Sequence, residues 1–233
     1  MGYTRDQPSP RYRELIDLYR TMHRVGDTAH GLSADKTFPG QSLPRQAHRI
    51  KPLIAHTQAK TILDYGSGKG LQYRPAPIKQ EGVVRWNSIQ EYWSVESIRC
   101  YDPAYEPLSE LPTGRFDGVV CTDVLEHCPE QDLDWIIDGF FAFAEKFVFA
   151  NVACYPAAKK LPNGENAHCT IRPAAFWKAK FDEAAARHPG VLWEIWLEES
   201  YGQGRPETRL ANFEPLRAAP ASVPRAGATW RMS

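Results

Sequence analysis

The 233-residue sequence lacks an excess of charge of either sign, because 28 Lys and Arg residues balance 28 Asp and Glu residues. Proteins that bind nucleic acid through their overall field usually carry a basic surplus, so a polyanion is not the favoured partner. No apolar run approaches the roughly 20 residues that span a bilayer, and the start lacks the apolar core of a signal peptide. We therefore expect a cytoplasmic protein with no membrane partner.

Cysteine is scarce and irregularly spaced. The five cysteines stand at positions 100, 121, 128, 154 and 169, and they form no C-x-x-C pair. This odd number and this spacing support neither a disulfide framework nor a zinc site, and they fit small buried thiols in a reducing compartment. We predict no metal site from the sequence.

What the sequence does contain is an alternation of helical and strand patterns. Apolar residues at helical spacing predict helices near residues 12–23, 50–54, 132–144 and 173–187. Short apolar runs predict strands at residues 61–65, 97–102, 116–123, 146–152 and 191–198. Such alternation is typical of a doubly wound α/β fold, a mostly parallel sheet with helices on both faces.

The chain divides into three predicted parts. Residues 1–45 form an N-terminal helical segment, whose helix either closes over a ligand as a lid or packs on the sheet. Residues 46–201 form the main domain. Residues 202–233 are rich in Pro, Ala, Gly and Arg, with few periodic apolar positions, and we expect a disordered tail there.

An acidic residue and alternate glycines follow the first predicted strand, in "TILDYGSGKGLQY" (residues 61–73). The G-x-G-x-G spacing matches neither the P-loop pattern G-x-x-x-x-G-K-[ST] nor the dinucleotide fingerprint G-x-G-x-x-G. Glycines let backbone approach a ligand closely, and backbone N–H groups there can receive a carboxylate or a phosphate. Because ligands of such sheets bind at the carboxyl ends of the strands, this turn predicts a ligand cradle.

Three stretches in the same order resemble the motifs of class I S-adenosylmethionine (SAM) dependent methyltransferases. They are the acid and glycines of residues 64–70, the strand end in "RCYDPAY", and "FDGVVCTDVLEHCPEQDLDWII" with its strand, acid and V-L-E-H. The resemblance implies a seven-stranded Rossmann-like fold and SAM as the cofactor. The cofactor-binding residues that it implies are Asp64, Gly66, Ser67, Gly68, Asp102, Pro103, Thr122, Asp123, Val124 and Leu125.

The spacing around Asp102 departs from the family pattern. Asp102 lies farther than usual from Asp64, and the interval to Phe116 is too short for a full helix–strand–helix. Either one strand unit is abbreviated and Asp102 accepts hydrogen bonds from both ribose hydroxyls, or Asp102 belongs to the next strand and lies near the adenine. We favour the first alternative, because Asp-Pro after an apolar run resembles the ribose motif.

A further stretch, "ACYPAAKKLPNGENAHCTIRPAAFW" (residues 153–177), is similar to uncharacterised bacterial and phage methyltransferases with an LP-[DN]-G-x-NAH segment. Asn166 is expected to bind substrate and His168 to act as a general base; the alternative is that both only hold the loop through backbone hydrogen bonds. Arg172 either binds an anionic group of the substrate or forms a surface ion pair. His127 is the second catalytic candidate, and its alternative is a structural position under the cofactor.

The resemblance implies methyl transfer to an oxygen or nitrogen nucleophile. The sequence carries neither [DNS]-P-P-[YFW] nor a Pro-Cys nucleophile, the signatures of base methylation. With zero net charge we favour a small-molecule or sugar-like acceptor. Two alternatives stay open: a methyltransferase acting on nucleic acid or a modified nucleotide, and a SAM-binding protein without transferase activity. The oligomeric state is not predicted.

Overall fold

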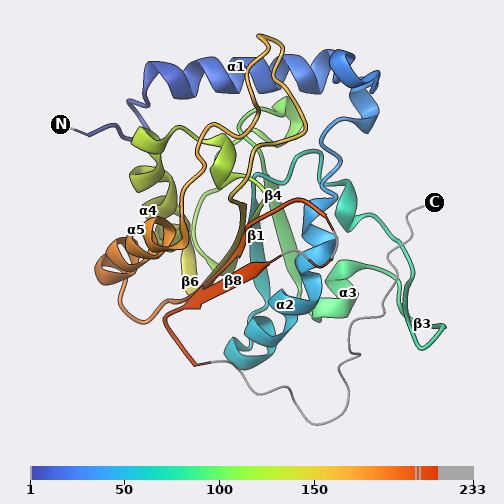
Figure 1. Cartoon of the computed structure of the whole chain (residues 1–233). Coiled ribbons are helices and arrows are strands. Elements are labelled where there is room, and N and C mark those ends of the chain that lie inside the picture. Colours follow the sequence, from blue (N-terminus) through green and yellow to red (C-terminus); the bar gives the residue numbers. More distant parts are fainter. Residues whose placement is uncertain (1, 203, 205, 215–233) are drawn as a thin grey trace.

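A six-stranded sheet in the order β4-β1-β5-β6-β7-β8 forms the centre of the molecule (Figure 1). The structure is a computed structural model, and it describes residues 2–202, 204 and 206–214. The strands are β1 (Thr61–Tyr65), β4 (Ser97–Tyr101), β5 (Phe116–Thr122), β6 (Ala144–Ala153), β7 (Leu192–Glu198) and β8 (Glu207–Ala211). All neighbours pair in parallel except β8, which is antiparallel to β7. The predicted Rossmann-like, mostly parallel α/β fold is confirmed.

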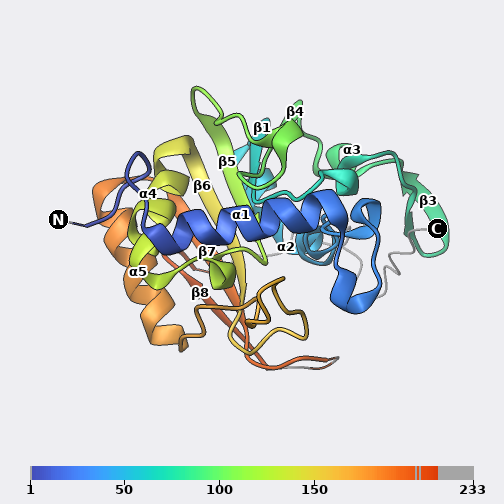
Figure 2. The ribbon, with the colours of Figure 1, turned by 90° about the horizontal axis from the view of Figure 1, so that it is seen from above.

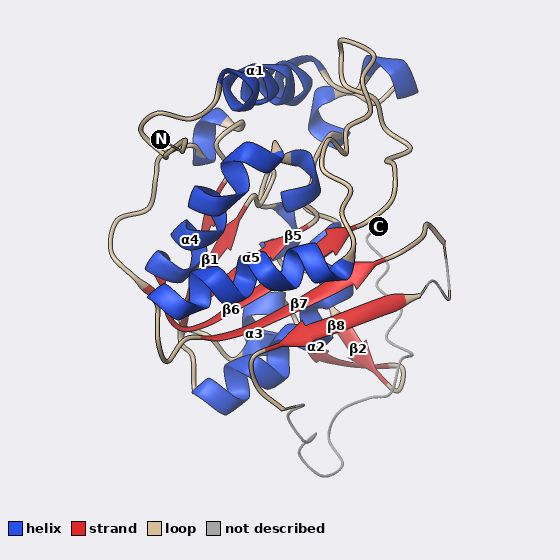
Figure 3. Ribbon diagram, turned by 60° about the vertical axis from the view of Figure 1, so that its left-hand side comes forward, coloured by secondary structure: helices blue, strands red, loops and turns tan. Residues whose placement is uncertain are grey.

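Helices cover both faces of this sheet (Figure 3). One face carries α2 (Ser42–Thr57) and α3 (Ile89–Trp93), and the other carries α4 (Leu133–Phe143) and α5 (Ala174–Arg187). Successive strand residues point to opposite faces, so Val119 of β5 packs with the α4 side and Val120 packs with the α2 side. Two separate apolar cores result, as a doubly wound sheet requires.

Helix α2 is longer than the sequence pattern predicts. It begins at Ser42 rather than near residue 50, and it contains Pro52 in its interior. Proline removes one backbone hydrogen bond from a helix. The helix continues because its apolar face is almost completely buried, which outweighs that loss; the face consists of Leu43, Ala47, Ile50, Leu53 and Ile54.

The connections around β4 show where the chain is abbreviated. A small hairpin of β2 (Ile78–Gln80) and β3 (Val83–Trp86) precedes α3 and β4, and it lengthens the interval between Asp64 and Asp102. The connection from β4 to β5 is short and contains the 3-10 turn Glu106–Leu108. Because β4 pairs directly with β1, Asp102 follows the strand next to the glycine turn, which is the favoured alternative.

Two expectations need correction. The main sheet of the described residues has six strands, whereas the resemblance implied seven. Residues 207–211, which fell within the predicted tail, form strand β8 on β7. The rest of the predicted tail, residues 215–233, lies outside the described residues. Among the helices that the structure describes, none combines the length and apolar character needed to cross a membrane.

Helix α1 (Pro10–Val25) crosses above the strand ends, as the view from above shows (Figure 2). Ser9 caps it by accepting a hydrogen bond from the Tyr12 N–H, 3.0 Å away. The same Ser9 hydroxyl donates to the Asp132 carboxylate over 2.5 Å, and the Ser9 N–H donates to that carboxylate over 3.0 Å. The amino end of α1 is therefore fixed to the start of α4.

Candidate functional site

A cavity of about 500 Å³ lies between α1 and the carboxyl ends of β1, β4 and β5. This volume falls within the range of roughly 300–1,000 Å³ that small-molecule sites occupy. Nine predicted cofactor residues line it: Asp64, Gly66, Ser67, Gly68, Asp102, Pro103, Thr122, Asp123 and Val124. The tenth, Leu125, is completely buried in the core beside it. The two candidate histidines, His127 and His168, also line the cavity.

The glycines of the turn after β1 are sterically required. Gly66 has a φ of 81°, and a Cβ there would lie 2.4 Å from Cγ2 of Val124. Gly68 has a φ of 59°, and a Cβ there would lie 2.4 Å from the backbone oxygen of Phe38. Both the left-handed backbone and the close neighbours exclude a side chain. The turn therefore brings bare backbone to the cavity wall.

The N–H groups of this turn bind protein rather than facing a ligand. The N–H groups of Gly66 and Ser67 donate to the backbone oxygen of Tyr101 over 2.8 and 3.1 Å. The Gly68 N–H donates to Oδ2 of Asp102 over 2.9 Å. The expectation that these N–H groups receive a ligand carboxylate or phosphate is therefore wrong, because β4 already satisfies them.

Asp64 holds the turn that follows β1 through side-chain hydrogen bonds. Its side chain is 2% exposed, and Oδ2 accepts hydrogen bonds from Gln72 Nε2 and Tyr73 Oη, each 2.9 Å away. Burial raises the pKa of the Asp64 carboxyl to about 7, although both hydrogen bonds oppose the shift. The neutral and ionised forms are therefore both accessible near neutral pH.

Asp102 stands at the end of β4 with both carboxylate oxygens directed by the backbone. Oδ2 accepts from the Gly68 N–H and Oδ1 accepts from the Ala104 N–H, each over 2.9 Å. Burial raises the pKa of this carboxyl to about 6, so it is mainly ionised at neutral pH. The side chain lines the cavity, so a carboxylate oxygen of Asp102 can accept a further hydrogen bond there.

Four side chains converge at the end of β5. One potential ligand atom each from Asp123, Glu126, His127 and His168 lies within 4.8 Å of every other. Asp123 occupies a left-handed conformation with a φ of 62°, which is unusual for a residue with a side chain. The carboxylate of Asp123 accepts a hydrogen bond from Ser42 Oγ over 2.8 Å.

Glu126 is completely buried at the base of this cluster. Its Oε1 accepts a hydrogen bond from the Ala153 N–H over 2.7 Å, whereas Oε2 has no hydrogen-bond partner among the described residues. Burial, followed by the charge of Asp123, raises the pKa of Glu126 well above its usual range.

Backbone carbonyls fix the tautomers of both histidines. Nδ1 of His127 lies 2.9 Å from the Ala167 oxygen, and Nδ1 of His168 lies 2.6 Å from the Tyr155 oxygen. A carbonyl only accepts, so each Nδ1 carries the proton and each Nε2 keeps a free lone pair. Burial lowers the pKa of His127 to about 4, so its ring is neutral at neutral pH. The two ring centres are 4.8 Å apart.

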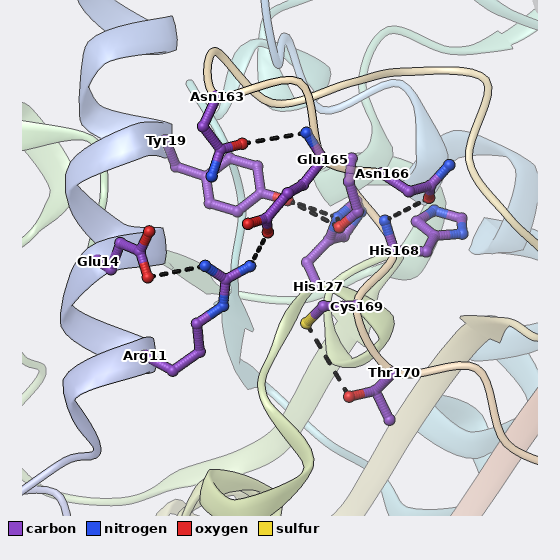
Figure 4. Close-up of polar contacts among 11 residues, drawn as sticks. Arg11, Glu14, Tyr19, His127, Asn163, Glu165, Asn166, His168, Cys169 and Thr170 are labelled. Atoms are coloured by element: carbon purple, nitrogen blue, oxygen red, sulfur yellow. Dashed lines mark hydrogen bonds and ion pairs between the residues drawn. The ribbon is translucent and has the colours of Figure 1, made fainter.

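Asn166 and Arg172 are the two residues expected to bind substrate, and neither points its polar group at a site for substrate. Asn166 Oδ1 accepts from the N–H groups of Ala157 and His168 over 3.0 and 2.9 Å, and Asn166 Nδ2 donates to the Ala157 oxygen over 2.8 Å. Asn166 thus shapes the turn that presents His168 (Figure 4). Arg172 lies outside the cavity lining and donates from Nε to Glu130 over 2.7 Å.

Sequence reasoning missed the segment before α2 as part of the site. Phe38, Gly40 and Ser42 line the cavity, and a Cβ at Gly40 would lie 1.8 Å from Oε1 of Gln72. The Pro39-Gly40 pair was a signal for such a turn, since proline followed by glycine marks a special backbone. Its approach to the glycine turn depends on contacts that no local pattern reveals.

Comparison with known proteins gives one distant match. No model of a known protein family matches the chain, and no solved structure matches it. The chain is 32% identical over 103 residues to the chloroplastic magnesium protoporphyrin IX methyltransferase of Arabidopsis thaliana. The match covers 40% of this chain and 32% of that protein, so the chain spans about a third of its relative's length. A Rossmann-like α/β chain thus has a methyltransferase among its distant relatives.

Proposed function

We propose that the chain is a SAM-dependent methyltransferase that transfers a methyl group to a small-molecule or sugar-like acceptor. This proposal rests on one observation: Asp64, the glycine turn, Asp102 and Asp123 all line the same cavity. These are the positions at which the class I resemblance implies cofactor contacts. The distant methyltransferase relative supports the same reaction class.

The residues present fit such a cofactor. The bare backbone at Gly66 and Gly68 lets Val124 and Phe38 pack closely against the turn, so that all four residues line the same cavity. Asp102 offers two carboxylate oxygens, which suit a pair of adjacent ribose hydroxyls. When bound, SAM supplies a methyl group on a sulfonium, which a nucleophile displaces in line. The chain's task is then to align the two reactants and to exclude water.

The size of the cavity favours a small acceptor. Helix α1 and the loop that carries His168 contribute Tyr19, His23 and Tyr155 to the cavity lining, and His23 lies beside Lys69 of the glycine turn. Nε2 of His168 has a lone pair that could accept a proton from an acceptor O–H or N–H. A cavity of this size suits a small molecule better than a polymer.

Calorimetric titration of the full chain with SAM and with S-adenosylhomocysteine tests the proposal. We expect both to bind, and we expect Asp102→Asn to weaken binding by more than about tenfold, the loss of roughly one charged hydrogen bond. Asp117→Asn is the matched control: Asp117 also accepts two backbone N–H groups, from Lys60 and Thr61, but it lies at the start of β5. Its substitution should leave the affinity unchanged.

The outcomes separate the alternatives. Binding of neither compound would contradict the proposal. If both bind, labelled SAM in a metabolite extract should give a labelled product. Binding without transfer to any acceptor would instead favour a SAM-binding protein without transferase activity.

A further inference from the structure

The cluster at the end of β5 contains an electrostatic imbalance. Glu126 is completely buried, and its Oε2 has no hydrogen-bond partner within the described part of the chain. A buried carboxyl oxygen without a partner is energetically unfavourable. Some proton or cation at this place is therefore expected to compensate it.

Glu126 and Asp123 lie close enough to share one proton, which is one way to compensate this oxygen, and a cation is the other. Asp123 is an acceptor when ionised. His127 and His168 direct their Nδ1 protons to the backbone oxygens of Ala167 and Tyr155, so each Nε2 presents a lone pair. One potential ligand atom from each of the four side chains lies within 4.8 Å of the others, and the groups that meet are two carboxyl groups and two imidazoles.

We propose that Asp123, Glu126, His127 and His168 bind one divalent transition-metal cation. Two imidazole nitrogens with two carboxylate oxygens suit Mn²⁺, Fe²⁺ or Zn²⁺. The carbonyl partners of both Nδ1 atoms fix the ring orientations, as outer partners of metal-ligating histidines do. The left-handed backbone of Asp123 places its carboxylate in the same group.

The site lies on the wall of the cavity assigned to the cofactor and the acceptor, since three of its four members line that cavity. Resting on the proposed function, with His168 binding the cation instead of accepting the acceptor's proton, the cation takes an oxygen of the acceptor, which makes the acceptor an alcohol or a phenol. A bound divalent cation lowers the pKa of such a hydroxyl. The hydroxyl releases its proton to solvent, the C–O bond forms as the C–S bond breaks, and a methyl ether and S-adenosylhomocysteine result.

Titration of the chelator-treated full chain with Mn²⁺ tests the site. The electron paramagnetic resonance signal of free Mn²⁺ measures how much of the cation stays unbound. We expect one equivalent to bind. Glu126→Gln and His168→Ala should each weaken binding by more than about tenfold, because even the loss of an outer partner costs roughly 10- to 100-fold. His56→Ala removes an exposed histidine outside the cluster and should leave the affinity unchanged. Calorimetry with Zn²⁺ repeats the comparison.

Failure of the folded wild-type chain to bind either cation stoichiometrically would overturn the proposal, and a proton shared by Glu126 and Asp123 would then account for the cluster. Equal losses in His56→Ala and His168→Ala would overturn it as well. Because the wild-type titration needs no variant, misfolding of Glu126→Gln leaves the test decisive. SAM binding without cation binding would refute this site alone, and cation binding without SAM binding would refute the proposed function alone.

Discussion

The hydroxyl of Tyr19 lies 2.7 Å from Nδ1 of His127, although 108 residues separate the two in the chain (Figure 4). The same hydroxyl lies 3.2 Å from the Ala167 oxygen, to which it donates. One tyrosine on α1 therefore contacts both segments that supply the candidate histidines. The orientation of the His127 ring depends on a helix far from it in sequence.

Tyr19→Phe should keep the ring packing and remove these polar contacts. We expect the free energy of unfolding to fall by about 1 kcal/mol, the usual contribution of a partly buried hydrogen bond. Urea unfolding measures the change. Tyr3→Phe, at a position 42% exposed, is the control and should stay within about 0.5 kcal/mol of the wild type. Equal effects in the two variants would show that the Tyr19 hydroxyl contributes nothing specific.

Gly66→Ala should damage the site more than an equally strained glycine elsewhere. A Cβ at Gly66 would lie 2.4 Å from Cγ2 of Val124, whereas one at Gly82 would meet no described atom within 4 Å. The two glycines have φ values of 81° and 80°, so Gly82→Ala imposes the same backbone strain of roughly 1–2 kcal/mol. We expect only Gly66→Ala to weaken binding of S-adenosylhomocysteine, measured by calorimetry. Unchanged affinity in that variant would contradict the cradle.

Asp64→Asn should change how stability depends on pH. Burial raises the pKa of the folded-state carboxyl to about 7 from an ordinary value of 3.8, so the folded protein holds this proton more tightly than the unfolded chain. The contribution is fully present below the ordinary pKa and is lost as pH rises through the folded pKa. Relative to the Asn variant, the wild type should lose up to about 4 kcal/mol between about pH 4 and pH 8.

Urea unfolding of both proteins across this range measures the difference, and taking the difference removes the contributions of other titrating groups. Parallel pH profiles would mean that the Asp64 carboxyl is not shifted.

Asn212→Ala should show whether β8 contributes to the fold. Asn212 Oδ1 accepts from the Trp193 N–H over 2.7 Å, and Asn212 Nδ2 donates to the Val191 oxygen over 3.0 Å. We expect the free energy of unfolding to fall by about 1–2 kcal/mol. Thr208→Ala, which removes an exposed hydrogen bond to Glu199, should change it by less than about 0.5 kcal/mol. A neutral Asn212→Ala would argue that β8 is only weakly attached.

Local patterns were sufficient for the elements that carry the cofactor positions. The strands before Asp64, Asp102 and Asp123 are short apolar runs, and their carboxyl ends meet because parallel strands align them. Strand β8 was not predictable in this way, because all of its residues are only half-buried and its pattern is weak. The sequence left two alternatives for the strand that carries Asp102, because the pairing of β4 with β1 is a long-range contact that no local pattern shows.

Local patterns could not predict the cluster at the end of β5, which consists of Asp123, Glu126, His127 and His168. Nothing in the local sequence marks Glu126 as part of a site, because its Oε1 accepts a hydrogen bond from the Ala153 N–H, 27 residues away. His168 reaches the cluster through a loop whose shape depends on Asn166. Neither contact leaves a periodic signal in the chain, so no metal was predicted.

The packing of α1 has a consequence for how the cavity opens. Leu15 and Met22 pack with Leu161 and Ala167 in a small cluster that, among the described residues, shares no member with the two cores on the sheet. Release of α1 therefore removes from the two sheet cores only the contact of Tyr12 with the α4-side core, and the amide hydrogens of α1 should exchange through a partial opening while those of β5 exchange only on global unfolding. With its amino end held by Asp132, the helix would swing about that end, and ligand entry and departure would follow the rate of this local event.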